Sequence, residues 1–197
     1  MGIQQWATIN NKGLLRNNVY TENIEVTTPE DLYTHLQSNY PKFYKMDKLC
    51  KWAFVATEYL LAGSSAVYKN IDRSKIAIVL STAHGCLDVD KRYADAAIPS
   101  PSLFVYTLPN IMLGELCIRH GFKGEQVCMV SEGFNASELH FAASTLLECK
   151  EMEACLCGYI DINAAGEPDV SLFWVTKSGG YYAFKADILK DLYGAAK

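Results

Sequence analysis

The sequence lacks several features that would place a protein in a broad class at once. No apolar run approaches the roughly 18 residues that a membrane-spanning helix needs, and the first residues show no signal-peptide pattern. Basic residues are not in excess, because 18 Lys and Arg stand against 22 Asp and Glu, a net charge of −4. This balance excludes the basic field typical of nucleic-acid binding. We therefore expect a cytoplasmic protein with no nucleic-acid partner and no membrane span.

The composition is typical of one folded domain. The chain has 197 residues, of which 50% are hydrophobic and 20% charged, and a chain of this size buries about 70% of its unfolded surface without needing disulfides or metal. The seven cysteines are odd in number and lie mostly in apolar segments, and the tightest pair is C-x-C, closer than the C-x-x-C spacing of redox and zinc sites. We predict a single domain over 1–197 with free cysteines, no metal site and no cofactor.

Strand-like and helix-like segments alternate along the chain, which predicts an α/β fold. The apolar patterns predict strands at 3–9, 76–80, 126–131 and 154–160, a helix that starts at 28–31, and helices at 46–61, 109–121 and 134–149. Between 126 and 160 the order strand, helix, strand predicts a right-handed βαβ crossover. Near the C-terminus, a Gly-Gly turn between 172–176 and 181–184 predicts a β-hairpin, and 187–193 a short helix.

Four stretches in the middle of the chain resemble the N-terminal half of a β-ketoacyl-[acyl carrier protein] synthase, in the thiolase-like superfamily. They are PKFYKMDKLCKWAFVATEYLLA (41–62), KIAIVLSTAHG (75–85), SPSLFVYTLPNIMLGELCIRHGFKGEQVCMVSEG (100–133) and the unit ending in CLCGYIDI (155–162). The resemblance is strongest over 41–162 and closest to the divergent synthases of aryl-polyene and related polyketide-type pathways. It implies a thiolase-like half-domain with a mixed, mostly parallel sheet and helices on both faces, followed here by the C-terminal hairpin and short helix.

The chain departs from the family at the nucleophile. Family enzymes carry a cysteine in a V-S-T-A-C-like bend after a strand, and the resemblance places that position on Phe134, or on Gly133 if the register slips by one. Neither side chain can form a thioester, and Cys128 lies back within the predicted strand. We expect no catalytic residue for condensation in this chain.

The family's catalytic histidines, or its His–Asn equivalent, belong to a second half-domain, and we expect this chain to end before one could begin. None of the histidines in the sequence therefore takes over those roles: His35, His84, His120 and His140. The resemblance implies a non-catalytic binding or partner subunit, a pseudoenzyme, in fatty-acid or polyketide-type acyl chain synthesis. The alternative is one part of a split 3-oxoacyl-[acyl carrier protein] synthase, an acyltransferase that a partner chain completes.

In the family, the strand before the bend pairs with its symmetry mate across a two-fold axis. The candidate dimer strand here comprises Gln126, Val127, Cys128, Met129, Val130 and Ser131. An exposed apolar edge strand needs to be covered, so we expect a homodimer or a heterodimer with a full-length ketosynthase. An acyl carrier protein is a further candidate partner. We also expect residues 170–193 to cover part of the surface that the second half-domain covers in the family.

A third hypothesis is a hydrolase or thiol enzyme centred on His84 and Cys86. Their i, i+2 spacing does not favour a proton relay, and no orienting carboxylate is identifiable in the sequence.

Ser131 is a candidate nucleophile by residue type alone, because it lacks the G-x-S-x-G frame. Three aspartates, Asp88, Asp90 and Asp95, lack the spacing of a calcium loop.

Overall fold

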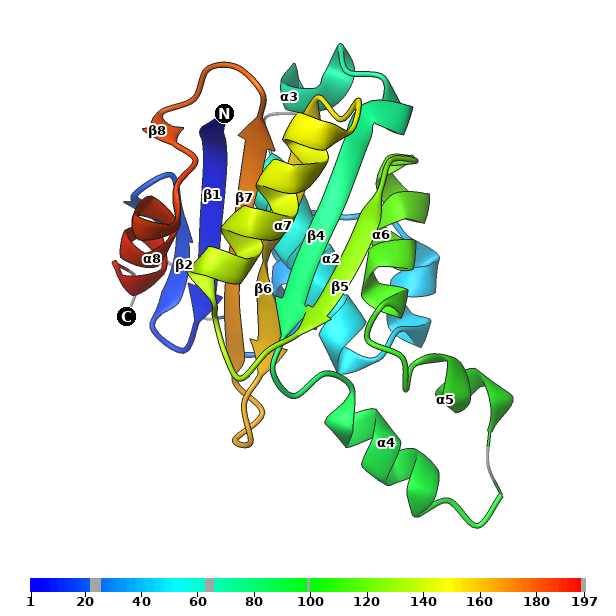
Figure 1. Ribbon diagram of the computed structural model, residues 1–197. Coiled ribbons are helices and arrows are strands. Elements are labelled where there is room, and N and C mark those ends of the chain that lie inside the picture. The colour runs from blue at the N-terminus through cyan, green and yellow to red at the C-terminus, as the bar shows by residue number, and fades with distance from the viewer. Residues whose placement is uncertain (22–25, 63–65, 99, 196–197) are drawn as a thin grey trace.

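One sheet of eight strands organises the computed structural model, which describes residues 1–21, 26–62, 66–98 and 100–195 (Figure 1). The strand order is β3-β2-β1-β7-β6-β4-β5, and β8 pairs with β1 beside this path. The strands are β1 (Gly2–Asn10), β2 (Gly13–Arg16), β3 (Val19–Tyr20), β4 (Ile76–Thr82), β5 (Gln126–Val130), β6 (Ala154–Ile162), β7 (Pro168–Thr176) and β8 (Tyr182–Ala183).

The sheet is mixed, as predicted, but it is not mostly parallel. Parallel pairing is confined to β4 with β5 and β4 with β6, and the other pairs are antiparallel. The reason is that β6 and β7 form a hairpin, with Ile162 opposite Pro168 across the turn at 163–167. The polar stretch after residue 10 also contributes two short antiparallel strands, β2 and β3, which the prediction did not include.

The predicted C-terminal hairpin is wrong. The strand β8 pairs not with β7 but with Gly2 and Ile3 of β1, on the side of β1 that faces away from β7. The Gly-Gly segment crosses over the start of β1 instead of turning tightly. Gly179 and Gly180 have φ of 73° and 140°, and a Cβ on Gly2 would lie 1.8 Å from the Gly179 carbonyl oxygen. Only glycines permit this crossing.

The predicted helices lie close to their expected positions, whereas α3, α4 and α5 were not predicted. Side chains cap the free backbone N–H groups at three of the helix starts. Thr28 forms a capping box at the start of α1, Asp47 caps α2, and Asn135 caps α7. The sequence also predicts that Gly63 ends the helix at 46–61, and this residue lies outside the described residues. The helices are α1 (Pro29–His35), α2 (Lys48–Leu61), α3 (Ala66–Lys69), α4 (Leu87–Ala94), α5 (Pro101–Val105), α6 (Ile111–His120), α7 (Ala136–Cys149) and α8 (Ala186–Gly194), with 3-10 turns at Pro41–Lys45 and Arg73–Lys75.

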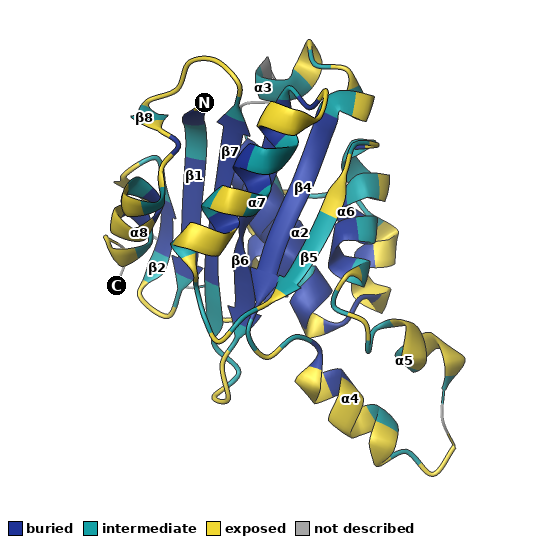
Figure 2. Cartoon of the chain, in the orientation of Figure 1, coloured by how far each residue is buried: buried dark blue, intermediate teal, exposed yellow. Residues whose placement is uncertain are grey.

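Helices cover both faces of the sheet, as predicted. The helices α2 and α6 pack on one face, in a core that includes Trp52 and Trp174, and α7 and α8 cover the other, where Leu139 and Leu189 are fully buried (Figure 1). The central strands β4, β6 and β7 are buried along almost their whole length (Figure 2). Within the C-terminal region 170–193, α8 packs on the same face of the sheet as α7, whereas β7 is a central strand.

The helices α4 and α5 project away from the sheet below the ends of β4 and β5 and are mostly exposed (Figures 1 and 2). Among the described helices none has the length and apolar character needed to cross a membrane.

Candidate functional site

The carboxyl ends of the three parallel strands meet at one edge of the sheet. In register, β4 lies between β5 and β6, so the loop after Thr82, the bend after Val130 and the end of β6 at Asp161 come together. This edge is where ligands bind in open α/β sheets. The predicted strand–helix–strand unit is therefore a crossover in which α7 connects β5 to β6 over β4. As a result, the bend after β5 and the loop after β4 lie side by side at this edge.

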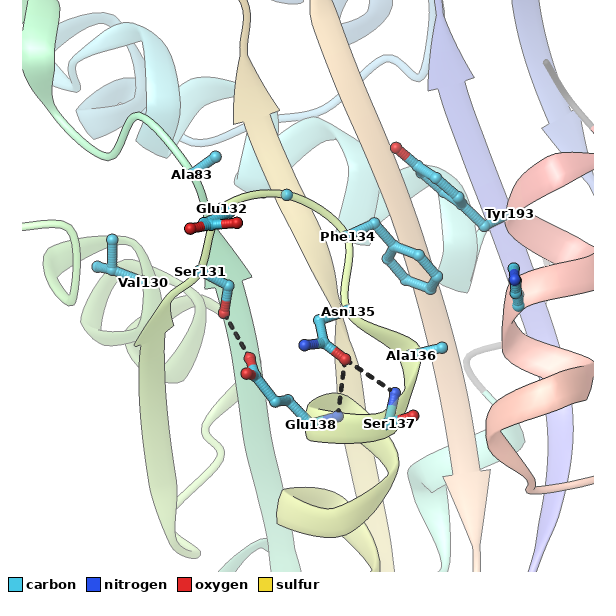
Figure 3. Close-up of a pocket in the computed structure, with 12 residues that line it drawn as sticks. Ala83, Val130, Ser131, Glu132, Phe134, Asn135, Ala136, Ser137, Glu138 and Tyr193 are labelled. Atoms are coloured by element: carbon cyan, nitrogen blue, oxygen red, sulfur yellow. Dashed lines mark hydrogen bonds between the residues drawn. The ribbon is translucent and has the colours of Figure 1, made fainter.

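The bend between β5 and α7 lines a cavity of about 1090 Å³ (Figure 3). Among its lining residues, the Ser131 hydroxyl donates to Glu138 Oε2 at 2.7 Å. The first free N–H groups of α7, from Ser137 and Glu138, donate to Asn135 Oδ1 at 3.2 Å each. Ser131 therefore faces a carboxylate and not an imidazole, and the helix start is satisfied by its own cap.

Phe134, the residue at the expected nucleophile position, is fixed by aromatic packing. Its ring stacks on Tyr193 of α8 with ring centroids 4.0 Å apart (Figure 3). It also meets the Tyr159 ring edge to face, with centroids 6.1 Å apart. Gly133, the other candidate, has open space around the site of a Cβ. Sequence reasoning found the bend but not this contact, because α8 lies about sixty residues further along the chain.

On the other side of β4, His84 and Asp161 form a close pair. His84 Nδ1 lies 2.7 Å from Asp161 Oδ2, and Asp161 Oδ1 accepts hydrogen bonds from the Thr82 hydroxyl (2.9 Å) and from the backbone N–H groups of Ala83 (3.2 Å) and His84 (2.9 Å). The Asp161 side chain is 4% exposed and the His84 side chain 47%. The expectation that His84 has no orienting carboxylate is therefore wrong, since the carboxylate lies on β6, 77 residues later.

The hydrogen bonds keep the Asp161 carboxylate ionised at neutral pH. Burial raises the pKa of Asp161, but the bonds from His84 and Thr82 outweigh burial and hold that pKa below its usual value. An ionised carboxylate can only accept, so the proton between the two side chains belongs to His84 Nδ1. A neutral His84 then has an unprotonated Nε2, which accepts hydrogen bonds or protons.

Cys86 is buried at the N-terminal end of α4, and burial raises the pKa of its thiol to about 12. This shift disfavours the thiolate that a thiol enzyme centred on His84 and Cys86 would need. Cys128 is half-buried, and burial raises its pKa too.

The other three histidines lie apart from this edge. His120 is buried 3.5 Å from Glu58, and burial lowers its pKa to about 4. His140 packs on Phe184, and His35 is in the last turn of α1. Within the described ranges no cluster of three or more His, Cys, Asp or Glu side chains is arranged to hold a metal ion.

The candidate dimer strand is an edge strand. Among the described strands β5 pairs with β4 alone. The N–H of Ser131 donates to Thr82 and the carbonyl of Glu125 accepts from Ile78, so the odd-numbered residues bond to β4 and the even-numbered backbone groups point outward. At the end of this free edge the Val130 side chain is 68% exposed, and Phe141 of α7 is 72% exposed.

Solved structures share this architecture. No family model and no curated protein matches the sequence. The ishigamide ketosynthase/chain length factor superposes with a TM-score of 0.61 at 15% identity, over 90% of this chain and 62% of that chain. The fold is that of the ketosynthases. A type II polyketide synthase complex, AntDE:AntF, of a ketosynthase and its acyl carrier protein gives a TM-score of 0.62 at 12% identity, over 89% of this chain and 62% of that one.

A chain of the complex between the ketosynthase ApeO and its chain length factor ApeC from Xenorhabdus doucetiae gives 0.58 at 14% identity, over 100% of this chain and 92% of that chain. The resemblance read from the sequence is thus confirmed for the fold. The chain spans about three-fifths of the length of the first two ketosynthase structures and nearly the whole of the third chain.

Proposed function

We propose that this protein is a ketosynthase-like partner subunit that does not itself carry out condensation, in fatty-acid or polyketide-type acyl chain synthesis. The observation that carries the proposal is Phe134, whose ring is stacked on Tyr193 at the bend where the sequence resemblance places the family's nucleophile, on Phe134 or Gly133. The structural neighbours support the setting, because two of them are described as a ketosynthase with its chain length factor.

The chemistry of the bend supports a non-catalytic role. Acyl transfer to an enzyme needs a nucleophile, and in condensing enzymes this is a thiolate. The seven residues from 130 to 136 read V-S-E-G-F-N-A and contain no cysteine. Ser131, the one hydroxyl among them, donates to Glu138 and has no imidazole base beside it in the described part of the chain.

The edge strand β5 supports a partner that continues the sheet. Among the described strands none pairs with the outward-pointing N–H and C=O groups of Gln126, Cys128 and Val130, and a second strand would satisfy these groups. We infer pairing through β5, either with a second copy or with a full-length ketosynthase, with an acyl carrier protein as a further partner. A location in the cytoplasm belongs to the same proposal.

A split synthase is the second candidate, and the His84–Asp161 pair favours it. An oriented imidazole at the strand ends could serve chemistry whose nucleophile comes from a partner chain. In the first candidate function this chain adds no catalytic group to the complex, whereas in the split synthase it adds the His84 imidazole.

The test uses tagged protein purified without denaturation from the organism that makes it. Native mass spectrometry is expected to show a complex of two chains, either two copies or one copy with a condensing enzyme. A monomer at micromolar concentration would contradict the proposal. Decarboxylation of a malonyl-carrier thioester should proceed with the condensing enzyme even when His84 is replaced. Loss of decarboxylation in the His84→Asn variant would favour the split synthase instead.

A further inference from the structure

A second cavity lies on the His84 side of β4, separate from the cavity at the bend. Its volume is about 440 Å³, and it is enclosed by the start of α2, the loop and first turn of α4, and the turn between β6 and β7. Its walls are mostly apolar, with Leu49, Leu87, Val89 and Ile162 among the lining residues. No role in the proposed partner function depends on this cavity.

Six polar side chains line the wall: Asp47, Lys48, His84, Asp88, Lys91 and Asn163. Asp47 accepts from the first N–H groups of α2, and Asp88 lies 3.8 Å from Arg92, so each of the two carboxylates already has a partner. The two lysines and His84 are relevant to a ligand. Lys48 Nζ donates to the Gly166 carbonyl at 2.8 Å and so bridges α2 to the turn. Lys91 also lines the cavity, and no ion-pair partner for its ammonium group is found among the described residues. The third is His84, whose Nδ1 is held by Asp161 while the described residues place no hydrogen-bond partner on Nε2.

The Asp161 contact fixes what His84 offers to this cavity. Four hydrogen bonds hold the buried carboxylate, so it cannot turn without breaking several of them, and the imidazole ring is held by the one bond from Nδ1. In the neutral imidazole the Nδ1 proton is committed to Asp161, so Nε2 is left as an acceptor. A carboxylate-held imidazole of this kind accepts a proton or a hydrogen bond from a donor placed beside it.

We propose that this cavity binds a small ligand with an apolar chain, a hydroxyl or thiol group that donates to His84 Nε2, and an anionic group held by Lys91. The apolar wall selects the chain, since burying it removes hydrocarbon from water. The imidazole selects the donor group, and Lys91 selects the charge. Asp161 is a positioning residue, because it acts on the ligand only through His84.

The probe is 6-hydroxyhexanoate, and its matched control is heptanoate, in which a methyl group replaces the hydroxyl. Binding is followed by NMR of ¹⁵N-labelled histidine side chains. Before ligand is added, the spectrum should show His84 protonated on Nδ1. Addition of 6-hydroxyhexanoate should shift His84 Nε2, and this probe should bind about tenfold more tightly than heptanoate, the ratio that one net hydrogen bond provides.

Two variants separate the site from general effects on folding. His84→Asn can keep a donor toward Asp161 but has no acceptor at the Nε2 position, so it should stay folded and bind both probes equally. Lys91→Gln should weaken both probes alike. Equal binding of both probes by the unchanged protein, an Nε2-protonated His84, no shift at His84 with either probe, or a hydroxyl preference that survives in His84→Asn would each overturn the proposal.

Discussion

Replacing Val130 by proline removes one outward-facing backbone donor from β5 and leaves the sheet within the chain intact. Val130 is even-numbered, so its N–H points away from β4, whereas Ser131 donates to Thr82. Proline also restricts the residue before it to extended conformations, which Met129 already adopts as part of the strand. The variant should therefore unfold at nearly the same temperature as the unchanged protein.

Pairing across the β5 edge should suffer strongly. A symmetric dimer would lose two N–H donors, each worth a net contribution of about 0.5–1.5 kcal/mol, or about 1–3 kcal/mol in all. The dissociation constant should rise about 5- to 150-fold, and more if the proline ring clashes with the second strand. Sedimentation equilibrium measures the constant, and Val130→Thr, which keeps the N–H, is the control. An unchanged dissociation constant in a folded Val130→Pro protein would refute pairing through β5.

Three further predictions concern stability. His120 has a pKa of about 4 when folded against about 6.5 when unfolded, so the unfolded chain binds the proton first as the pH falls. The free energy of unfolding, measured by chemical denaturation, should therefore drop by about 3 kcal/mol between pH 6.5 and 4. A His120→Gln variant whose free energy of unfolding changes with pH by the same amount would contradict this. Gly158→Ala should cost more than about 3 kcal/mol, because the new Cβ would lie 2.2 Å from the Ser171 carbonyl oxygen, whereas Gly133→Ala, with open space, should melt normally in calorimetry. Phe134→Ala removes the stack on Tyr193 and should lower stability by about 1–3 kcal/mol and speed hydrogen exchange in α8; unchanged exchange there would show that the stack does not hold α8.

The sequence predicted the helices and strands well where interactions between neighbouring residues determine where they begin and end. The Thr28-Pro29 start of α1 and the Gly121 end of α6 depend on side chains and backbone angles within one turn of the helix. The apolar segment at 76–80 became a strand covered on both faces, as its composition indicated. The family resemblance then supplied the fold, which composition alone could not.

Contacts between distant residues were not predictable in this way. The hairpin signal at 177–180 is equally consistent with a crossing, and the crossing occurs because β1 occupies the position beside β7. The pairing of His84 with Asp161 depends on the register of β4 with β6, which sets Ser81 opposite Tyr159. A one-residue change in that register would move Asp161 to the other face of the sheet.

The most direct test of the central claim asks which chain becomes acylated. The protein, together with the condensing enzyme that co-purifies with it, is incubated with an acyl thioester of the carrier protein, and the intact mass of each chain is measured. The account predicts an acyl adduct on the condensing enzyme and none on this chain. An adduct on this chain that maps to residues 131–135 would contradict it.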